Sequence, residues 1–283
     1  MEKDPGRLKV LERIEENEKN GLFSKTVEDD PPTIPLTPDK VDYLNKKLSN
    51  KIATFFVNKI ALKFILNLVK NNQMRIKAIN GLENYEEIEK SGAVLTCNHF
   101  NPFDNFAIHY ALIPYLYDKR KALYKVIREG NFTNFPGLYG FFFRHCNTLP
   151  LSANFSTMKK FLDSVKVLLA RGEKILIYPE QEMWWNYRKP RPPEAGAYRF
   201  AAYSNVPVLP ILITMNDTQD IGSDGFPIQE YTVNFLKPIY PDPALGPKHN
   251  MEQMRKKNYE AWKNKYEEFY GIPLTYSCGP VNI

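Results

Sequence analysis

Apolar and polar residues recur with two different periods along the 283-residue chain, and each period predicts one kind of element. Short runs rich in β-branched and aromatic residues, bounded by turn residues, predict strands. The predicted strands are 74–80, 93–99, 122–128, 174–180, 206–214 and 231–239. Between them, apolar residues recur with the helical period. The predicted helices are 102–117, 157–171, 196–204 and 251–270. This alternation predicts an α/β fold with a mixed, mostly parallel sheet flanked by helices.

The segment 38–72 has a long amphipathic pattern and predicts one long helix or a pair of helices. Its apolar side consists of Ile52, Phe55, Phe56, Ile60, Leu62, Phe64, Ile65, Leu68 and Val69. Its lysines are Lys40, Lys46, Lys47, Lys51, Lys59, Lys63 and Lys70. Seven lysines against Asp39 and Asp42 give this N-terminal basic amphipathic segment a charge of +5. Two interpretations stay open: a helix that packs on the core with its lysines in solvent, and a helix that lies on an anionic membrane surface.

Residues 1–37 precede this segment and contain few large apolar residues. Residues 1–30 hold nine acidic and six basic residues, and the proline-rich stretch 29–40 follows. Opposite charges at i,i+4 spacing would support a short helix over 7–19, but little there would hold such a helix against a core. We therefore predict that residues 1–37 form a charged, flexible and solvated extension.

Composition narrows the classes of function. The chain has 38 Lys and Arg against 32 Asp and Glu, and this net charge of +6 is too small to indicate nucleic-acid binding. The three cysteines, Cys97, Cys146 and Cys278, form no CxxC pair. This spacing predicts neither a disulfide framework nor a structural zinc site, and it favours a reducing cytoplasm.

Any contact with a membrane is expected to be peripheral. The sequence begins MEKDPGRLKV and lacks the apolar stretch of a secretory signal. No run of about 18 uncharged apolar residues occurs, so we expect no helix that spans a bilayer. The expected location is the cytoplasmic face of a membrane.

The main candidate for chemistry follows the predicted strand 93–99, where the sequence reads CNHFNPFD. In open α/β sheets, ligands bind at the carboxyl ends of strands. On one continuous helix, His99 and Asp104 would point about 140° apart. If His99 instead ends the strand, while Asn101 caps a helix that begins at Pro102, then Asp104 can face the imidazole. Its carboxylate would accept a hydrogen bond from Nδ1 and leave Nε2 free to take a proton from a substrate hydroxyl.

A second cluster, 178–185, lies just beyond the predicted strand 174–180. Downstream, Arg188, Lys189 and Arg191 interleave with prolines in a loop that could meet an anionic headgroup or a cofactor phosphate. Structural interpretations also stay open. An aspartate in a first helical turn is favoured by the helix dipole, a lone histidine is more often structural than catalytic, and a basic loop is often only a solvated surface.

These segments, taken in order, resemble the conserved blocks of the glycerolipid acyltransferase family, whose best-known members acylate lysophosphatidic acid. The first segment is similar to the family motif NHxxxxD, and the third is similar to the start of its Phe-Pro-Glu-Gly-Thr-Arg block. The four segments are Asn98-His99-x4-Asp104, 137–151, 178–180 and 206–210. The resemblance covers about residues 74–240 and implies that residues 73–283 form an acyltransferase domain.

The resemblance also implies roles for the motif residues. His99 would be the general base, with Asp104 orienting its ring, and the acyl group would pass directly from a thioester to a lipid hydroxyl. No metal and no bound cofactor is implied, and acyl-CoA or acyl-acyl carrier protein would be the co-substrate. The implied partners are the lipid acceptor, the acyl donor and the membrane surface, with acyl carrier protein as a further candidate and no nucleic acid.

Two departures from the family pattern concern the acceptor. Gln181-Glu182-Met183 stands where the third block continues Gly-Thr-Arg, and Pro150-Leu151 stands where the second block ends in Asp-Arg. Both arginines that the family associates with the acceptor phosphate are therefore missing. Either other basic residues replace them or the acceptor lacks that phosphate. The candidate substrate-binding residues are Asn98, Glu180, Gln181, Arg144, Arg188, Lys189 and Arg191.

Three hypotheses about function follow. The first is acyl transfer to the hydroxyl of a lysophospholipid such as 1-acylglycerol 3-phosphate. The second keeps this chemistry but uses a non-phosphate lipid or another alcohol or amine as acceptor. The third is a lipid-binding protein that kept the fold and lost turnover, although the intact pair of His99 and Asp104 argues against it.

Overall fold

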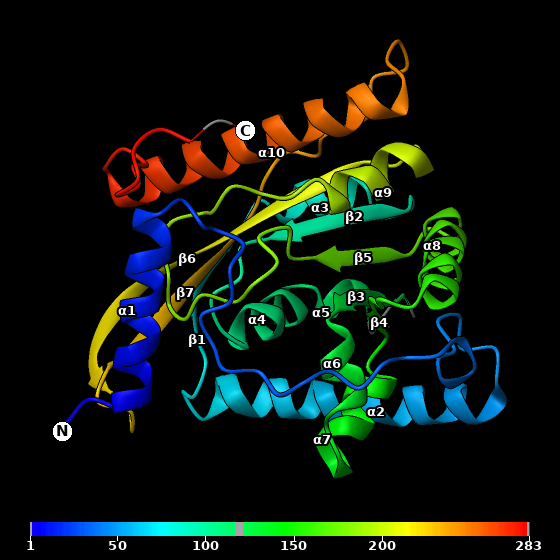
Figure 1. Ribbon diagram of the computed structural model, residues 1–283, viewed down its shortest axis with the longest axis horizontal. Helices are drawn as coiled ribbons and strands as arrows, with labels where there is room; N and C mark the ends of the chain where they lie inside the picture. Colours follow the sequence, from blue (N-terminus) through cyan, green and yellow to red (C-terminus); the bar gives the residue numbers. More distant parts are fainter. Residues whose placement is uncertain (1, 117–120, 282) are drawn as a thin grey trace.

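The structure is a computed structural model that describes residues 2–116, 121–281 and 283 (Figure 1). Within these residues, seven strands form one sheet in the order β1-β7-β6-β2-β5-β3-β4. The strands are β1 (Arg75–Asn80), β2 (Ala93–Cys97), β3 (Leu123–Ile127), β4 (Thr148–Pro150), β5 (Lys174–Ile177), β6 (Val208–Ile221) and β7 (Pro227–Phe235). Neighbours are parallel except β6 and β7, which are antiparallel. The predicted mixed, mostly parallel sheet is confirmed.

Helices cover both faces of this sheet. The α-helices are α1 (Pro5–Lys19), α2 (Leu48–Lys70), α3 (Leu82–Glu87), α4 (Phe103–Ala111), α5 (Ile113–Leu116), α6 (Glu129–Thr133), α7 (Gly137–His145), α8 (Phe155–Ala170), α9 (Gly196–Ser204) and α10 (Pro247–Tyr270). A 3-10 turn, η1, spans Pro38–Lys40. In β2, Leu95 and Cys97 pack with α2 to α5 on one face, while Val94 packs with α8 to α10 on the other. Figure 1 shows α10 and α2 on opposite sides of the sheet.

Two predicted elements around the site differ from the structure. The helix predicted over 102–117 divides at Leu112 into α4 and α5, and Tyr117 lies outside the described residues. Pro114 explains the division, since it has no N–H to continue the helical hydrogen bonds. The aromatic stretch 135–145, for which we predicted no element, contains α7, whose turn at Gly140 packs directly against the carbonyl of Phe135.

The prediction of a solvated N-terminal extension is wrong. Asp4 caps α1 by accepting a hydrogen bond from the N–H of Arg7 at 2.8 Å. Val10 and Ile14 are buried on the inner side of α1. They belong to a hydrophobic cluster with Phe23, Val27, Trp184, Trp185, Phe226 and Tyr276. The apolar residues that hold α1 come mainly from distant parts of the chain, so the local pattern could not reveal this packing.

Residues 20–37, which we call the N-terminal strap, lead from α1 to η1 and are tied to distant loops at several points. The carbonyl of Phe23 accepts a hydrogen bond from Arg191 Nη1 at 2.8 Å, and the carbonyl of Lys25 accepts one from Trp184 Nε1 at 2.9 Å. Farther along, the N–H of Leu36 donates to Oε1 of Glu129 at 2.6 Å. The strap therefore runs past the loops that follow β5 and β3.

Helix α2 has an apolar side toward the protein and another toward solvent. Val57, Ile65 and Leu68 are buried, and α2 contacts α4 and α7. Its outer side exposes large apolar residues, namely Leu48, Ile52, Phe55, Phe56, Ile60, Phe64 and Leu66. By length and composition alone, this 23-residue helix is long and apolar enough to cross a membrane. The expectation that no helix spans a bilayer therefore stays a prediction.

Candidate active site

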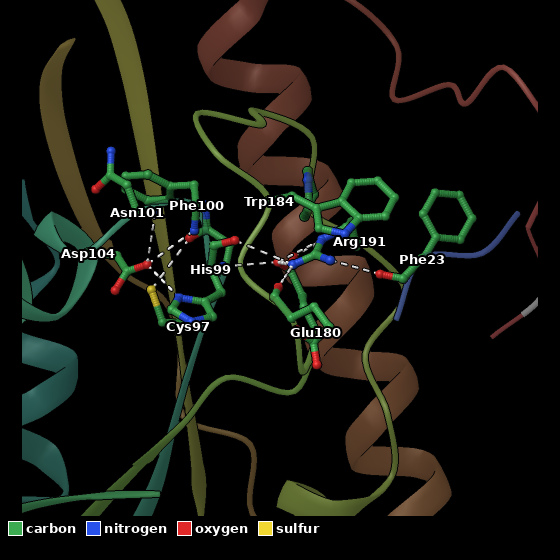
Figure 2. A network of polar contacts seen from close by, with 12 residues as sticks. Phe23, Cys97, His99, Phe100, Asn101, Asp104, Glu180, Trp184 and Arg191 are labelled. Atoms are coloured by element: carbon green, nitrogen blue, oxygen red, sulfur yellow. Dashed lines mark hydrogen bonds and ion pairs between the residues drawn. The ribbon is translucent and has the colours of Figure 1, made fainter. Parts of the chain in front are cut away.

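The turn from β2 into α4 brings His99 and Asp104 together. Oδ2 of the buried Asp104 carboxylate lies 2.7 Å from Nδ1 of His99 and also accepts the N–H groups of Phe100 at 3.1 Å and Asn101 at 3.4 Å (Figure 2). The Oδ1 of Asn101 accepts from the N–H of Phe103 at 2.9 Å, so the first helical residue is Phe103, one later than expected. The expected pairing of imidazole and carboxylate is present.

The ring of His99 is held in one orientation with one nitrogen available. Because a carboxylate only accepts, Nδ1 carries the proton that it donates to Asp104, and Nε2 is left as an acceptor. Tyr178 stacks on the ring, with centroids 4.1 Å apart and planes 23° apart. Burial, together with a smaller contribution from the Asp104 carboxylate, raises the pKa of Tyr178 well above its usual value. Tyr178 is therefore a neutral platform beside a histidine side chain that is 23% exposed.

Glu180 and Arg191 form a buried ion pair behind this turn, with Nη2 of Arg191 2.9 Å from Oε2 of Glu180. The same Oε2 accepts the N–H of His99 at 3.0 Å, and Arg191 Nη2 also donates to the carbonyls of His99, at 3.3 Å, and Glu182. Arg191 is fully buried, and its guanidinium carbon lies over the ring of Trp184, 4.5 Å from the ring centroid. Burial lowers the pKa of Arg191, and Glu180 opposes this shift. Both side chains are therefore engaged in fixing the turn, and their contact with the acceptor stays a prediction.

Two further candidates also have structural roles. The buried amide of Asn98 bridges β2 to β6, donating to the carbonyl of Ile213 at 3.0 Å and accepting its N–H at 2.9 Å. Its polar atoms are thus engaged within the sheet. Gln181 lies between Glu180 and Glu182 with φ of 67°, in the left-handed region, and its side chain is exposed. Of these two expected substrate-binding residues, only Gln181 presents its side chain to solvent.

The other basic candidates have partners in other parts of the fold. Arg144 lines a cavity of about 240 Å³ together with Asn147 and Thr148, at the amino end of β4. Because β4 runs parallel to β3, β5 and β2, this cavity lies at the opposite end of the strands from His99. Arg188 pairs with Asp217 on β6 at 2.6 Å. Lys189 pairs with Glu18 of α1 at 2.7 Å. The replacement of the missing family arginines by one of these three side chains stays a prediction.

Sequence reasoning missed a basic residue at the correct edge of the sheet. Arg128 directly follows β3, and its Nη1 lies 2.5 Å from Oδ2 of Asp30 and 3.1 Å from Oε2 of Glu182. Its position at the carboxyl end of the predicted strand 122–128 could have identified it. Glu182 therefore pairs with Arg128 through its carboxylate, while its carbonyl accepts from Arg191.

In the described part of the chain, no three His, Cys, Asp or Glu side chains gather in an arrangement that could hold a metal ion. The chemistry assembled at the carboxyl edge is instead that of a general base. An imidazole with a free Nε2, a buried carboxylate on Nδ1 and a rigid turn can accept a proton from a hydroxyl group.

Comparison with known proteins agrees with this arrangement. Residues 78–214 match the family model for acyltransferases. Among solved structures, the chain is similar to the 1-acyl-sn-glycerophosphate (LPA) acyltransferase PlsC from Thermotoga maritima, with a TM-score of 0.52 and 18% identity over 82% of this chain and 87% of that one. At this identity the likeness is one of fold. No curated protein matches the sequence significantly.

Proposed function

Because the chain belongs to the acyltransferase family, and is an O-acyltransferase, we propose that it moves a fatty acyl group from an acyl thioester to the hydroxyl of a lysophospholipid. The observation that carries this proposal is the geometry at His99, whose Nδ1 lies 2.7 Å from the buried carboxylate of Asp104. The acceptor class agrees with that of the 1-acyl-sn-glycerophosphate acyltransferase from Thermotoga maritima.

The proposed reaction is direct transfer. Nε2 of His99 takes the proton of the acceptor hydroxyl as the oxygen attacks the thioester carbonyl. The new C–O bond forms, the C–S bond breaks, and the departing thiolate takes the proton back from the imidazolium. The buried carboxylate of Asp104 stabilises the imidazolium between these steps and keeps Nε2 turned toward the acceptor. No group of the protein is acylated in this scheme.

The acyl donor in this proposal is acyl-CoA or acyl-acyl carrier protein. Both deliver a thioester, and the general base needs nothing else from the donor. If the donor is acyl-acyl carrier protein, the carrier protein is a transient partner. Since both donors occur in the cytoplasm, we propose that the enzyme acts at the cytoplasmic face of a membrane.

The proposed membrane contact is the outer side of α2 together with α7, which contacts it. Besides the exposed apolar residues of α2, this surface exposes Phe135, Leu138, Tyr139 and Phe141, and Leu138 and Tyr139 are 69% and 76% exposed. Exposed apolar side chains of this number on one surface suit a lipid interface. Since α2 also packs its inner side on α4 and α7, we propose that it lies in the plane of the interface and does not cross the bilayer.

The experiment is acyl transfer by the full-length chain in anionic liposomes, with acyl-CoA or acyl-acyl carrier protein and a panel of lysolipid acceptors. His99→Ala is expected to lower transfer about 10³-fold, and Asp104→Asn about 10²-fold or more, because general base catalysis is lost or misdirected. His249→Ala is the matched control, since His249 is exposed at the start of α10.

Either of two results would count against this proposal. The first is undiminished transfer by His99→Ala. The second is a stable acyl-protein adduct that forms with the donor alone, since direct transfer has no such intermediate. If a folded wild-type chain transfers no acyl group with any donor and acceptor, the lipid-binding hypothesis replaces the enzyme.

A further inference from the structure

Three charged side chains form a cluster beside the His99 turn, and we call Asp30, Arg128 and Glu182 the charged triad. Arg128 Nη1 lies 2.5 Å from the Asp30 carboxylate and 3.1 Å from the Glu182 carboxylate. The side chains of Arg128, Asp30 and Glu182 are 49%, 45% and 19% exposed. The triad therefore joins the strap to the loops after β3 and β5, and it remains accessible from solvent.

The triad is tied to the catalytic turn through Arg191. Nη2 of Arg191 donates to the carbonyls of both His99 and Glu182. A single nitrogen therefore links the backbone at His99 to the backbone at Glu182. In addition, β5 alone separates β2 from β3, so the ends of these two strands lie roughly 10 Å apart. A glycerol backbone with its headgroup can span that distance. An acceptor with its hydroxyl at His99 can thus place its headgroup at the triad.

The triad carries an unbalanced negative charge. The two preceding carboxylates of the strap are matched one to one, Glu28 with Arg7 at 3.0 Å and Asp29 with Arg13 at 3.1 Å. At Arg128, by contrast, one guanidinium faces two carboxylates, which leaves a net charge of −1 at neutral pH. Arg128, the side chain that would attract an anionic headgroup, is therefore already paired with one carboxylate, and a second carboxylate lies beside it in excess.

We infer, on the basis of the proposed acyl transfer, that the acceptor headgroup carries an ammonium group and that Asp30 and Glu182 select for it. A phosphate monoester carries a charge of roughly −1.5 to −2 at neutral pH and would be repelled by the carboxylate in excess. In a headgroup that combines an ammonium with a phosphodiester, the ammonium pairs with a carboxylate while the phosphodiester contacts Arg128. Exposed ion pairs are weak, so the headgroup can take the place of one of them.

The test measures headgroup binding apart from turnover. Full-length His99→Ala protein is titrated calorimetrically with lysophosphatidylethanolamine, lysophosphatidic acid and uncharged 1-acylglycerol, all with the same acyl chain. We expect the ethanolamine lipid to bind about fivefold more tightly than either of the others. Introducing Asp30→Asn and Glu182→Gln together should remove this preference and increase the affinity for lysophosphatidic acid about fivefold. Asp29→Asn, one position away, should leave all three affinities unchanged.

Tighter binding of lysophosphatidic acid or of 1-acylglycerol than of the ethanolamine lipid would overturn the inference. So would a preference for the ethanolamine lipid that survives the change of Asp30 and Glu182. Wild-type turnover of the same three lipids is measured in parallel. Because the titrations use protein without the base, an absence of turnover on every lipid counts against the proposed function only, and the binding preference still decides the role of the triad.

Discussion

The buried ion pair of Glu180 and Arg191 is the residue-level feature on which the turn carrying His99 and Asp104 depends. Arg191 has no exposed surface, and its guanidinium bonds to Glu180 and to the carbonyls of Phe23, His99 and Glu182. Such a pair contributes little by itself, because burying two charges costs about as much as their attraction returns. It does fix the geometry of the three segments that it joins, since an unpaired charge at this depth is strongly unfavourable.

We therefore predict that Arg191→Met lowers the free energy of unfolding by about 3–5 kcal/mol, because it leaves the Glu180 carboxylate buried without a partner. Urea unfolding measures this change. Adding Glu180→Gln should recover part of the loss, since it removes the uncompensated charge. Arg188→Met is the matched control. Its side chain is 39% exposed and pairs with Asp217 at the surface, so the expected loss is below about 1 kcal/mol. An Arg191→Met protein as stable as wild type would contradict the structural role.

The pairing of His99 with Asp104 could be predicted from the sequence, and the role of Arg191 could not. Strand, cap and helix start follow each other within eight residues at His99, so local rules were enough to bring Asp104 to the imidazole. The role of Arg191 depends on a contact with the strap at Phe23, 168 positions earlier. From sequence alone, a basic side chain that contacts a phosphate cannot be distinguished from one that pairs with a buried carboxylate.

In helix α2, the structure divides the apolar residues differently from the sequence prediction. The apolar residues predicted to form one side are divided between two: Ile65 and Leu68 are buried, while Phe55, Phe56 and Ile60 are more than half exposed. Periodicity reports how many apolar residues a helix has, but a neighbouring helix decides which of them are covered. The aromatic stretch of α7, which supplies that neighbour, gave no periodic signal of its own.

If α2 lies on a membrane, its exposed aromatics should contribute to binding without contributing to the fold. Changing Phe55 and Phe56, which are 54% and 58% exposed, to serine should weaken sedimentation with anionic liposomes about 30-fold. The free energy of unfolding should stay within about 0.5 kcal/mol of wild type. Tyr203→Ser is the matched control, since Tyr203 is 54% exposed on α9, on the other face of the sheet. Equal loss of liposome binding in both proteins would remove α2 from the membrane contact.

At the scale of the whole molecule, both ends of the chain close around the loop that follows β5. Sequence patterns predicted the sheet and most of its helices, because each strand and helix carries its own period. They did not predict that α1 packs on Trp184 and Tyr276, since both of these residues are remote from that helix in sequence. The side chain of Glu18 on α1 contacts both the loop after β5 and the C-terminal segment. It accepts hydrogen bonds from Lys189 at 2.7 Å, from Tyr187 at 2.9 Å and from the N–H of Ser277 at 2.8 Å.

This arrangement predicts a dependence on pH. Burial favours the neutral carboxyl, but the bonds from Lys189, Ser277 and Tyr187 outweigh it and hold the pKa of Glu18 below its usual 4.5. A lowered folded-state pKa stabilises the protein above the unfolded value and loses that contribution as the pH falls through the folded value. We expect Glu18→Gln to cost about 2 kcal/mol at pH 7 and progressively less below pH 4.5, measured by urea unfolding across this range.

Hydrogen exchange locates the same effect within the fold. Amides of α1 should exchange faster in Glu18→Gln protein at pH 7, while amides of β2, in the centre of the sheet, should keep their protection, because α1 packs through its own hydrophobic cluster. Glu15→Gln is the matched control, since Glu15 is exposed on the same helix. A difference between wild type and Glu18→Gln that is the same at pH 4 and pH 7 would show that packing, and not the charge of Glu18, joins the two ends of the chain.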